Sequence, residues 1–144
     1  VHFIGRLQSN KVRQLAHLVT VLATIDRLSL VDEVAKRMPG GKILLQVNAT
    51  GEEQKGGCLP ADVPTLLKHA RAMGLDVRGL MTVGPTGSSS EATRLAFQTV
   101  RGLVDDHGLE VCSMGMSGDL DIAIECGSTE VRVGSALFGQ RPAQ

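Results

Sequence analysis

Short apolar runs alternate with amphipathic segments along the whole chain. The runs predict β-strands at residues 21–25, 42–47, 77–83, 109–114 and 131–133. Between them, apolar positions recur at steps of three and four, which is typical of helices with one buried face. These segments occupy residues 30–38, 60–73, 91–106 and 119–126. The β-α-β-α order predicts parallel strands joined by right-handed crossovers.

Two further helix features follow from residue types near the N-terminus. Asn10 and Ser29 are suited to cap helices, because their side chains can accept hydrogen bonds from free backbone N–H groups. The helix after Asn10 is expected to bury Val12, Leu15, Val19 and Leu22. In the helix after Ser29, Glu33 and Arg37 are four residues apart and are expected to form an ion pair.

Two α/β architectures fit this pattern. They are an open, doubly wound parallel sheet and a (β/α)₈ barrel. The continuous apolar run at residues 43–47 indicates a sheet covered on both faces, which both architectures provide. The length of 144 residues predicts a single domain over residues 1–144, and it argues against a complete barrel, which typically needs about 250 residues.

Composition narrows the class of protein. The 15 Lys and Arg balance the 15 Asp and Glu, so no net charge favours nucleic acid or a membrane surface as a partner. No segment approaches the ~20 apolar residues of a membrane helix. The three cysteines lack metal-ligand spacing and predict reduced thiols in a cytoplasmic protein. Because the chain starts at Val1, we expect a fragment that lacks an N-terminal portion.

Two glycine- and serine-rich turns follow predicted strands and could bind phosphate. One is Ser113-Met-Gly-Met-Ser-Gly118, and the other begins at Gly134-Ser135. Each leads into a predicted helix, whose first N–H groups favour anions. Ordinary capped helices with glycine turns explain either turn alone, but two on successive strands favour a phosphorylated ligand.

Two cationic residues are candidates for ligand contacts. Arg132 lies between two valines, so alternation turns its side chain away from theirs, toward a barrel interior or a ligand. The alternative is an arginine at the edge of the core that pairs with Glu130 or Glu125. Lys55 lies in a polar, glycine-rich loop and could reach a ligand, although most lysines in such loops are simply solvated.

Five motifs in order give the chain a specific resemblance. They are His2-Phe-Ile-Gly-Arg-Leu-Gln-Ser-Asn-Lys11, Gln46-Val-Asn48, Gly79-Leu-Met-Thr82, Ser113-Met-Gly-Met-Ser117 with Gly127-Ser-Thr129, and Val131-Arg-Val-Gly-Ser-Ala-Leu-Phe-Gly139. In these motifs the chain resembles the pyridoxal phosphate homeostasis family over essentially its whole length. Members of that family are single-domain barrels similar to the N-terminal domain of alanine racemase.

The resemblance implies an incomplete (β/α)₈ TIM barrel that carries about strands three to eight. It also implies pyridoxal 5′-phosphate at the end of the barrel where the strands terminate. Ser117, Gly134 and Ser135 match phosphate-binding positions, and Arg132 matches the residue that faces the pyridine nitrogen. The other implied cofactor-binding residues are Met81, Met116, His2 and Asn48, with His2 placed at the cofactor end of its strand.

The resemblance implies a non-catalytic carrier and regulator of the cofactor, with pyridoxal phosphate-dependent apoenzymes as recipients. The lysine that binds the cofactor covalently in the family precedes the His2–Lys11 motif and is absent. An arginine at the ring nitrogen disfavours carbanion chemistry. One alternative is a related enzyme such as an amino-acid racemase, which needs a tyrosine that this chain lacks. A second alternative is a barrel that binds another phosphorylated ligand.

Overall fold

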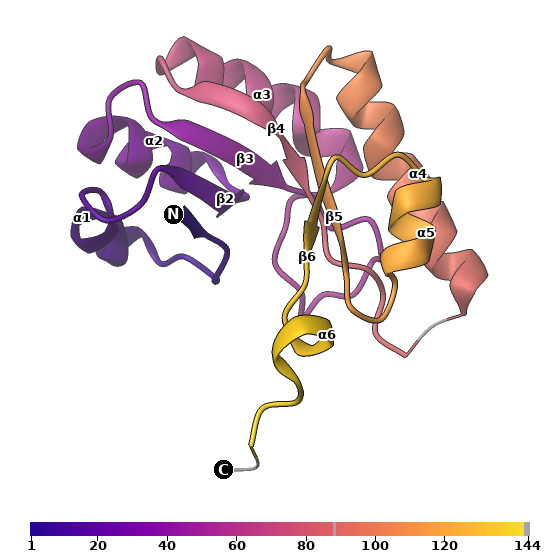
Figure 1. Cartoon of the computed structure of the whole chain (residues 1–144). Coiled ribbons are helices and arrows are strands. Elements are labelled where there is room, and N and C mark those ends of the chain that lie inside the picture. Colours follow the sequence, from indigo (N-terminus) through magenta and orange to yellow (C-terminus); the bar gives the residue numbers. More distant parts are fainter. Residues whose placement is uncertain (88, 143–144) are drawn as a thin grey trace.

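A curved, parallel sheet forms the centre of the computed structural model, which describes residues 1–87 and 89–142 (Figure 1). The strands are β1 (His2–Phe3), β2 (Val21–Ile25), β3 (Lys42–Gln46), β4 (Asp76–Met81), β5 (Val111–Met116) and β6 (Glu130–Arg132). The α-helices are α1 (Val12–Leu15), α2 (Leu28–Arg37), α3 (Val63–Ala72), α4 (Ser90–Asp106), α5 (Leu120–Glu125) and α6 (Ser135–Phe138). Two 3₁₀ helices, η1 (Ser9–Lys11) and η2 (Pro60–Asp62), precede α1 and α3.

The order of the strands decides between the two predicted architectures. Each strand pairs in parallel with the next strand along the chain, in the order β1-β2-β3-β4-β5-β6. A doubly wound sheet reverses its strand order at a switch point, whereas a (β/α)₈ barrel adds strands in sequence. The structure therefore confirms the incomplete barrel and excludes the doubly wound sheet.

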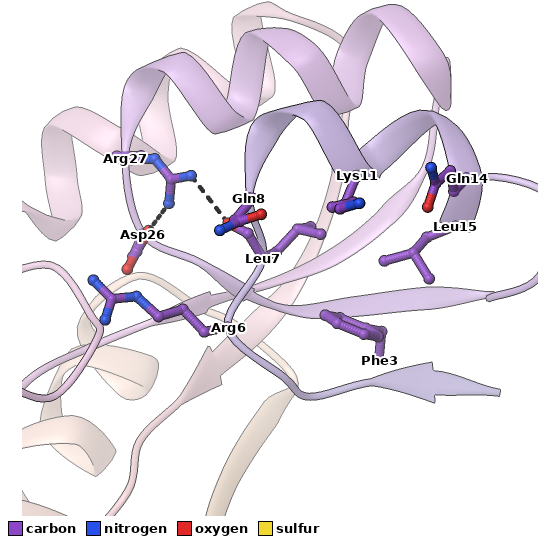
Figure 2. Close-up of a pocket in the computed structure, with 9 residues that line it drawn as sticks. All are labelled: Phe3, Arg6, Leu7, Gln8, Lys11, Gln14, Leu15, Asp26 and Arg27. Atoms are coloured by element: carbon purple, nitrogen blue, oxygen red, sulfur yellow. Dashed lines mark hydrogen bonds and ion pairs between the residues drawn. The ribbon is translucent and has the colours of Figure 1, made fainter.

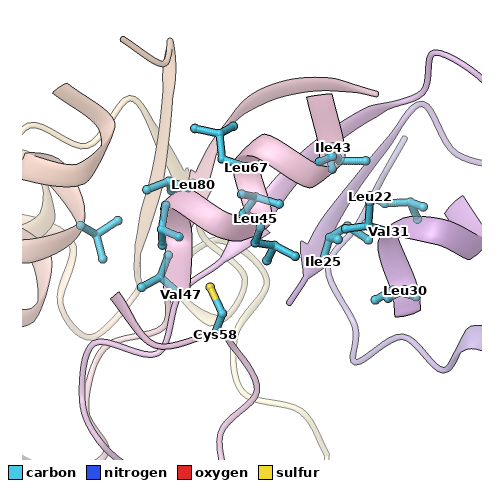
Figure 3. Close-up of a cluster of buried hydrophobic side chains, with 14 of the residues drawn as sticks. Leu22, Ile25, Leu30, Val31, Ile43, Leu45, Val47, Cys58, Leu67 and Leu80 are labelled. Carbon is cyan, nitrogen blue, oxygen red and sulfur yellow. The ribbon is translucent and has the colours of Figure 1, made fainter. Parts of the chain in front are cut away.

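Buried side chains cover both faces of the sheet. The larger cluster lies between the strands and helices α2 to α5, and it includes Leu22, Ile43, Leu45 and Leu80 (Figure 3). The smaller cluster lies on the opposite, inner face and is made of Val21, Ala23, Leu44 and Met81. Alternation along β2 and β3 assigns neighbouring residues to opposite clusters, as expected for strands whose faces are both buried.

The inner face is strongly curved. His2 on the first strand and Glu130 on the last approach each other, with 3.9 Å between His2 Nδ1 and Glu130 Oε1. Because four strands separate β1 from β6, this contact requires the sheet to bend around its inner face. Such bending is the geometry of a barrel wall.

The first helix and two caps differ from the prediction. Helix α1 ends at Leu15, and Leu22 lies in β2, because its spacing from Val12 only happens to match a helical repeat. Asn10 lies within η1, and the prediction that it caps the first helix is wrong. Ser29 lies inside α2, so the prediction that it caps this helix is also wrong.

The predicted ion pair on α2 is confirmed, because Arg37 Nε donates to Glu33 Oε1 at 2.9 Å. The structure also has a cap at the start of α4, where the Ser89 hydroxyl accepts from the backbone N–H of Ala92. The neighbouring Ser88 lies outside the described residues.

Candidate functional site

A cavity of about 630 Å³ lies where β5 and β6 end. Its lining residues are Met116, Ser117, Gly118, Arg132, Gly134, Ser135, Phe138, Gly139, Gln140 and Arg141. Five of them were predicted from the sequence as cofactor-binding residues. The structure therefore brings together the two serine-and-glycine turns, which are more than a dozen residues apart along the chain.

Strand pairing places these turns side by side. Met116, the last residue of β5, is in register with Arg132, the last residue of β6. The turn after Met116 is closed by its backbone N–H, which donates to Asp119 Oδ1 at 2.7 Å. After β6 the chain enters α6 directly, with Gly134 at the N-cap position and Ser135 as the first helical residue. Both turns consequently open at the same edge of the sheet.

Arg132 lies on the inner face, as alternation predicted. Its Nη1 donates to Ser113 Oγ at 2.7 Å, and its Nη2 donates to the carbonyl oxygen of Thr82 at 2.6 Å. Burial lowers the pKa of the guanidinium, and the negative charges of Glu130 and Asp119 oppose that shift. A guanidinium still remains protonated throughout the ordinary pH range. The cavity therefore contains a fixed positive charge.

The predicted ion pair of Arg132 with Glu125 or Glu130 takes a different form. Glu125 instead pairs with Arg94, which belongs to α4. Glu130 is linked to Arg132 through Ser113, whose hydroxyl lies 3.2 Å from Glu130 Oε1. This hydroxyl therefore separates the two charged groups.

Three predicted cofactor-binding residues do not line this cavity. Met81 is 2% exposed and packs in the inner apolar cluster. The amide of Asn48 is used within its own loop: its Nδ2 donates to the carbonyl of Glu52, and its Oδ1 accepts from the N–H groups of Thr50 and Gly51. The third residue, His2, is discussed next.

His2 lies at the opposite end of the sheet from the cavity. It is in register with Val21, the first residue of β2, and lines a separate cavity of about 190 Å³ with Lys42 and Arg78. The expectation that His2 lies at the cofactor end of its strand is wrong. The strand itself ends at Phe3, so His2 is its first residue.

Lys55 closes a loop in this structure. Its ammonium donates to the carbonyl of Gly84 and lies 3.3 Å from Glu52 Oε1. Glu52 in turn accepts from the backbone N–H of Thr86, and this hydrogen bond is the main cause of the lowered pKa of Glu52. These contacts tie the loop after β3 to the loop after β4.

A larger cavity, of about 860 Å³, lies beside β1 and α1 (Figure 2). Several of its lining residues belong to the His2–Lys11 motif, including Phe3, Arg6 and Lys11. A positive charge is already neutralised there, because Arg27 Nη1 lies 2.9 Å from Asp26 Oδ1. This cavity contains none of the predicted cofactor-binding residues. The residues of the His2–Lys11 motif that line it therefore lie outside the candidate phosphate site.

The cysteines and carboxylates show no metal chemistry within the described ranges. All three thiols are free, and burial raises the pKa of Cys58 and of Cys112 to about 11. In residues 1–87 and 89–142, no group of three potential ligands among His, Cys, Asp and Glu is placed to hold a metal ion. None of the helices in this part of the chain has the length and hydropathy needed to cross a membrane.

Sequence reasoning missed Ser113 as an individual contact and Arg141 as a lining residue. Ser113 was placed both in the predicted strand at residues 109–114 and at the start of the turn; β5 continues to Met116, and Ser113 is a polar inner-face residue in an apolar strand. Alternation would have detected it. Arg141 follows the last helix, where no repeating pattern indicates its direction.

Comparisons with known proteins agree with this geometry. A family model described as alanine racemase, N-terminal domain, matches residues 2–142. The pyridoxal phosphate homeostasis protein of Pseudomonas aeruginosa is 41% identical over 147 residues, which cover 97% of this chain and 64% of that protein. The relative from Aquifex aeolicus with the same name is also 41% identical and is covered to 66%. The chain thus spans just under two thirds of the length of these curated relatives.

Solved structures give the same result. PipY of Synechococcus elongatus, in its structure without pyridoxal phosphate, superposes with a TM-score of 0.89 at 30% identity, covering 96% of this chain and 70% of that one. The structure of PipY with pyridoxal phosphate bound gives a TM-score of 0.82 at 29% identity, with 96% and 69% covered. The chain therefore belongs to the alanine racemase N-terminal domain family and, within it, to the pyridoxal phosphate homeostasis proteins.

Proposed function

We propose that this chain, as one domain over residues 1–144, binds pyridoxal 5′-phosphate in the cavity at the ends of β5 and β6. The observation that carries the proposal is the convergence of Ser117, Gly134, Ser135 and Arg132 on that cavity. Hydroxyl and backbone N–H donors beside a guanidinium suit a phosphate ester attached to an aromatic ring. A relative named for pyridoxal phosphate homeostasis and PipY with pyridoxal phosphate bound support the identity of the ligand.

The cavity residues have separate roles in this proposal. Ser117 and Ser135 hold the phosphate from two sides, and Gly134 allows it to approach the backbone. Arg132 directs N–H donors at the ring nitrogen, and Met116 forms part of the wall. For Met81, Asn48 and His2 a cofactor-binding role stays a prediction, since these residues lie in the inner core, in the loop after β3 and at the opposite end of the sheet.

The function that best fits these roles is a non-catalytic carrier and regulator of pyridoxal phosphate. When bound, this cofactor supplies a reactive aldehyde and a ring that can withdraw electrons. Arg132 can only donate hydrogen bonds, so it leaves the ring nitrogen unprotonated and weakens that withdrawal. The chain also contains no tyrosine, which racemase chemistry requires as a second base. Recipients would be pyridoxal phosphate-dependent apoenzymes in the cytoplasm, where free thiols such as Cys58 remain reduced.

The direct test is titration of the 144-residue chain with pyridoxal phosphate, measured by isothermal calorimetry and by absorbance. We expect saturable binding to one site. Ser117→Ala and Ser135→Ala should each weaken it about ten- to hundredfold, since a hydrogen bond to a charged group contributes roughly 1.5–3 kcal/mol. Ser29→Ala is the matched control, because Ser29 is exposed on α2, far from the cavity in the chain and in the sheet order.

Three outcomes would contradict the proposal. They are no saturable binding by the wild-type chain, equal losses in Ser29→Ala and Ser117→Ala, and robust racemisation of alanine by the wild-type chain. Pyridoxal without its phosphate provides a further comparison. Its affinity should be low in the wild type and should not change in the Ser117 and Ser135 variants.

A further inference from the structure

A buried hydroxyl stands between two charged groups on the inner face of β5 and β6. Ser113 is 1% exposed, and its Oγ accepts from Arg132 Nη1 at 2.7 Å. On its other side the same Oγ lies 3.2 Å from Glu130 Oε1. Strand register explains the arrangement, because Ser113 on β5 is paired with Glu130 on β6, two residues before Arg132.

The chemistry of Arg132 and Glu130 fixes the direction of the two hydrogen bonds that Ser113 makes. A guanidinium has only donors, and a carboxylate has only acceptors. The single proton of the serine hydroxyl must therefore point to Glu130, and its lone pairs must point to Arg132. Glu130 thus orients the hydroxyl so that it presents an acceptor to the guanidinium.

Arg132 has a second anchor at its other terminal nitrogen. Nη2 donates to the carbonyl oxygen of Thr82, at the end of β4, at 2.6 Å. Bonds from two nitrogens to two different strands fix the plane of the guanidinium and its rotation. They use two of the five N–H donors of an arginine, which leaves donors for a ligand in the cavity that Arg132 lines.

We propose that Ser113, oriented by Glu130, is a positioning residue that holds the Arg132 guanidinium toward the ring of the bound cofactor. This inference rests on the proposed function, because the ligand of the guanidinium is the pyridine ring of pyridoxal phosphate. It assigns to Ser113 and Glu130 a role in ring recognition and no role in phosphate binding. A flexible arginine would lose more conformational freedom on binding than one that is already fixed.

The test compares two ligands, pyridoxal phosphate and inorganic phosphate, across variants at Ser113, Glu130 and Arg132. We expect Ser113→Ala to weaken pyridoxal phosphate binding about three- to tenfold, since it removes one acceptor of a charged hydrogen bond. Glu130→Ala should weaken it by a smaller factor, about two- to threefold, because the hydroxyl remains but loses its orientation. Inorganic phosphate, which needs only the two turns, should bind Ser113→Ala and Glu130→Ala with about the wild-type affinity.

A double variant that also changes Arg132 distinguishes a positioning role of Ser113 from a general loss of structure. Arg132→Gln alone should weaken pyridoxal phosphate binding about tenfold. The double variant Ser113→Ala/Arg132→Gln should be no weaker than Arg132→Gln, because residues that act through one contact are not additive. Ser113→Thr retains a hydroxyl and should restore most of the affinity. Thermal unfolding of each variant, followed by circular dichroism, shows whether it is folded at the assay temperature.

The outcomes distinguish this inference from the proposed function. If the wild-type chain binds no pyridoxal phosphate, the proposed function fails. If the wild type binds and Ser113→Ala leaves its affinity unchanged, lowers the affinity for both ligands equally, or adds fully to Arg132→Gln, the positioning role is wrong. If Ser113→Ala does not fold, Glu130→Ala alone and combined with Arg132→Gln gives the same test from a partly exposed position.

Discussion

The sheet can be divided into two halves, strands β2 to β4 and strands β5 to β6. The inner faces of these halves differ in polarity. In the first half the buried inner residues are apolar, namely Val21, Ala23, Leu44 and Met81, and charged side chains line only the small cavity at the N-terminal ends of the strands. In the second half the inner positions hold Ser113, Glu130 and Arg132, which form a hydrogen-bonded chain. The outer faces do not differ in this way, because one apolar cluster runs behind both halves.

This difference between the inner faces predicts that one half mainly affects stability and the other half mainly affects ligand binding. Apolar burial contributes free energy in proportion to the area removed from water. A buried polar chain contributes little net free energy, since its groups lose hydration when they pair. The first half should therefore determine the free energy of unfolding, and the second half should determine ligand affinity. Substitutions in each half test the division.

The largest expected effect is on stability, in the apolar half. Leu44, at the centre of β3, is 1% exposed and belongs to the inner apolar cluster, so Leu44→Ala should lower the free energy of unfolding by about 2–5 kcal/mol. Urea denaturation measured by circular dichroism gives this value. Leu18→Ala is the control, because Leu18 is 69% exposed and the same truncation there should cost under about 0.5 kcal/mol. Similar losses in the two variants would contradict the division.

The contact between the two halves, where β4 pairs with β5, should be nearly as sensitive to substitution. Gly79 on β4 faces β5 so closely that an added Cβ would lie 1.9 Å from the carbonyl oxygen of Val111. Gly79→Ala must push the strands apart, and we expect it to cost about 1–3 kcal/mol of unfolding free energy.

A second glycine supplies a control of opposite sign. Gly102 lies within α4 and has nothing within 4 Å of an added Cβ. Gly102→Ala should therefore stabilise the chain by about 0.5–1 kcal/mol, through helix propensity alone. If Gly79→Ala proved as well tolerated as Gly102→Ala in the same urea denaturation, the close approach of β4 and β5 would not be a constraint.

The sequence predicted the sheet better than it predicted the site. Strands such as β3 are continuous apolar runs, and burial on both faces leaves that pattern in the residues themselves. The turns at Ser117 and Ser135 were also predicted, because glycine and serine after a strand are a local signal. No local sequence signal shows that these two turns line the same cavity, because that depends on the order of the strands in the sheet.

What the sequence missed has the same origin. His2 was placed at the wrong end of its strand, because a motif does not show where in a strand its residues lie. The Asn48 side chain, whose contact with the cofactor stays a prediction, holds its loop through Thr50 and Glu52, and short-range amide bonds of this kind are invisible in composition. Local patterns thus reveal which residues are buried, while contacts across the sheet require its geometry.

An intermediate effect is expected for binding, in the polar half. Arg132→Gln should weaken pyridoxal phosphate binding about tenfold, which corresponds to about 1.4 kcal/mol. Its free energy of unfolding should fall by about 1 kcal/mol, less than for Leu44→Ala, because removing the guanidinium also removes its desolvation cost. Parallel calorimetry and urea denaturation measure both quantities. A loss of stability that matches Leu44→Ala, with affinity retained, would reverse the assignment of the two halves.

The smallest effect is expected on the surface that covers the apolar half. Glu33 and Arg37 pair across one turn of α2, at 2.9 Å, with both side chains partly exposed. Glu33→Gln should lower the free energy of unfolding by only about 0.2–0.5 kcal/mol. This loss should shrink in 1 M NaCl, because the Debye length there is about 3 Å. Lys36→Gln, on the same helix and outside this pair, is the control for neutralising one charge on α2. A salt-independent loss above about 1 kcal/mol would mean that charge as well as apolar burial holds α2 against the sheet.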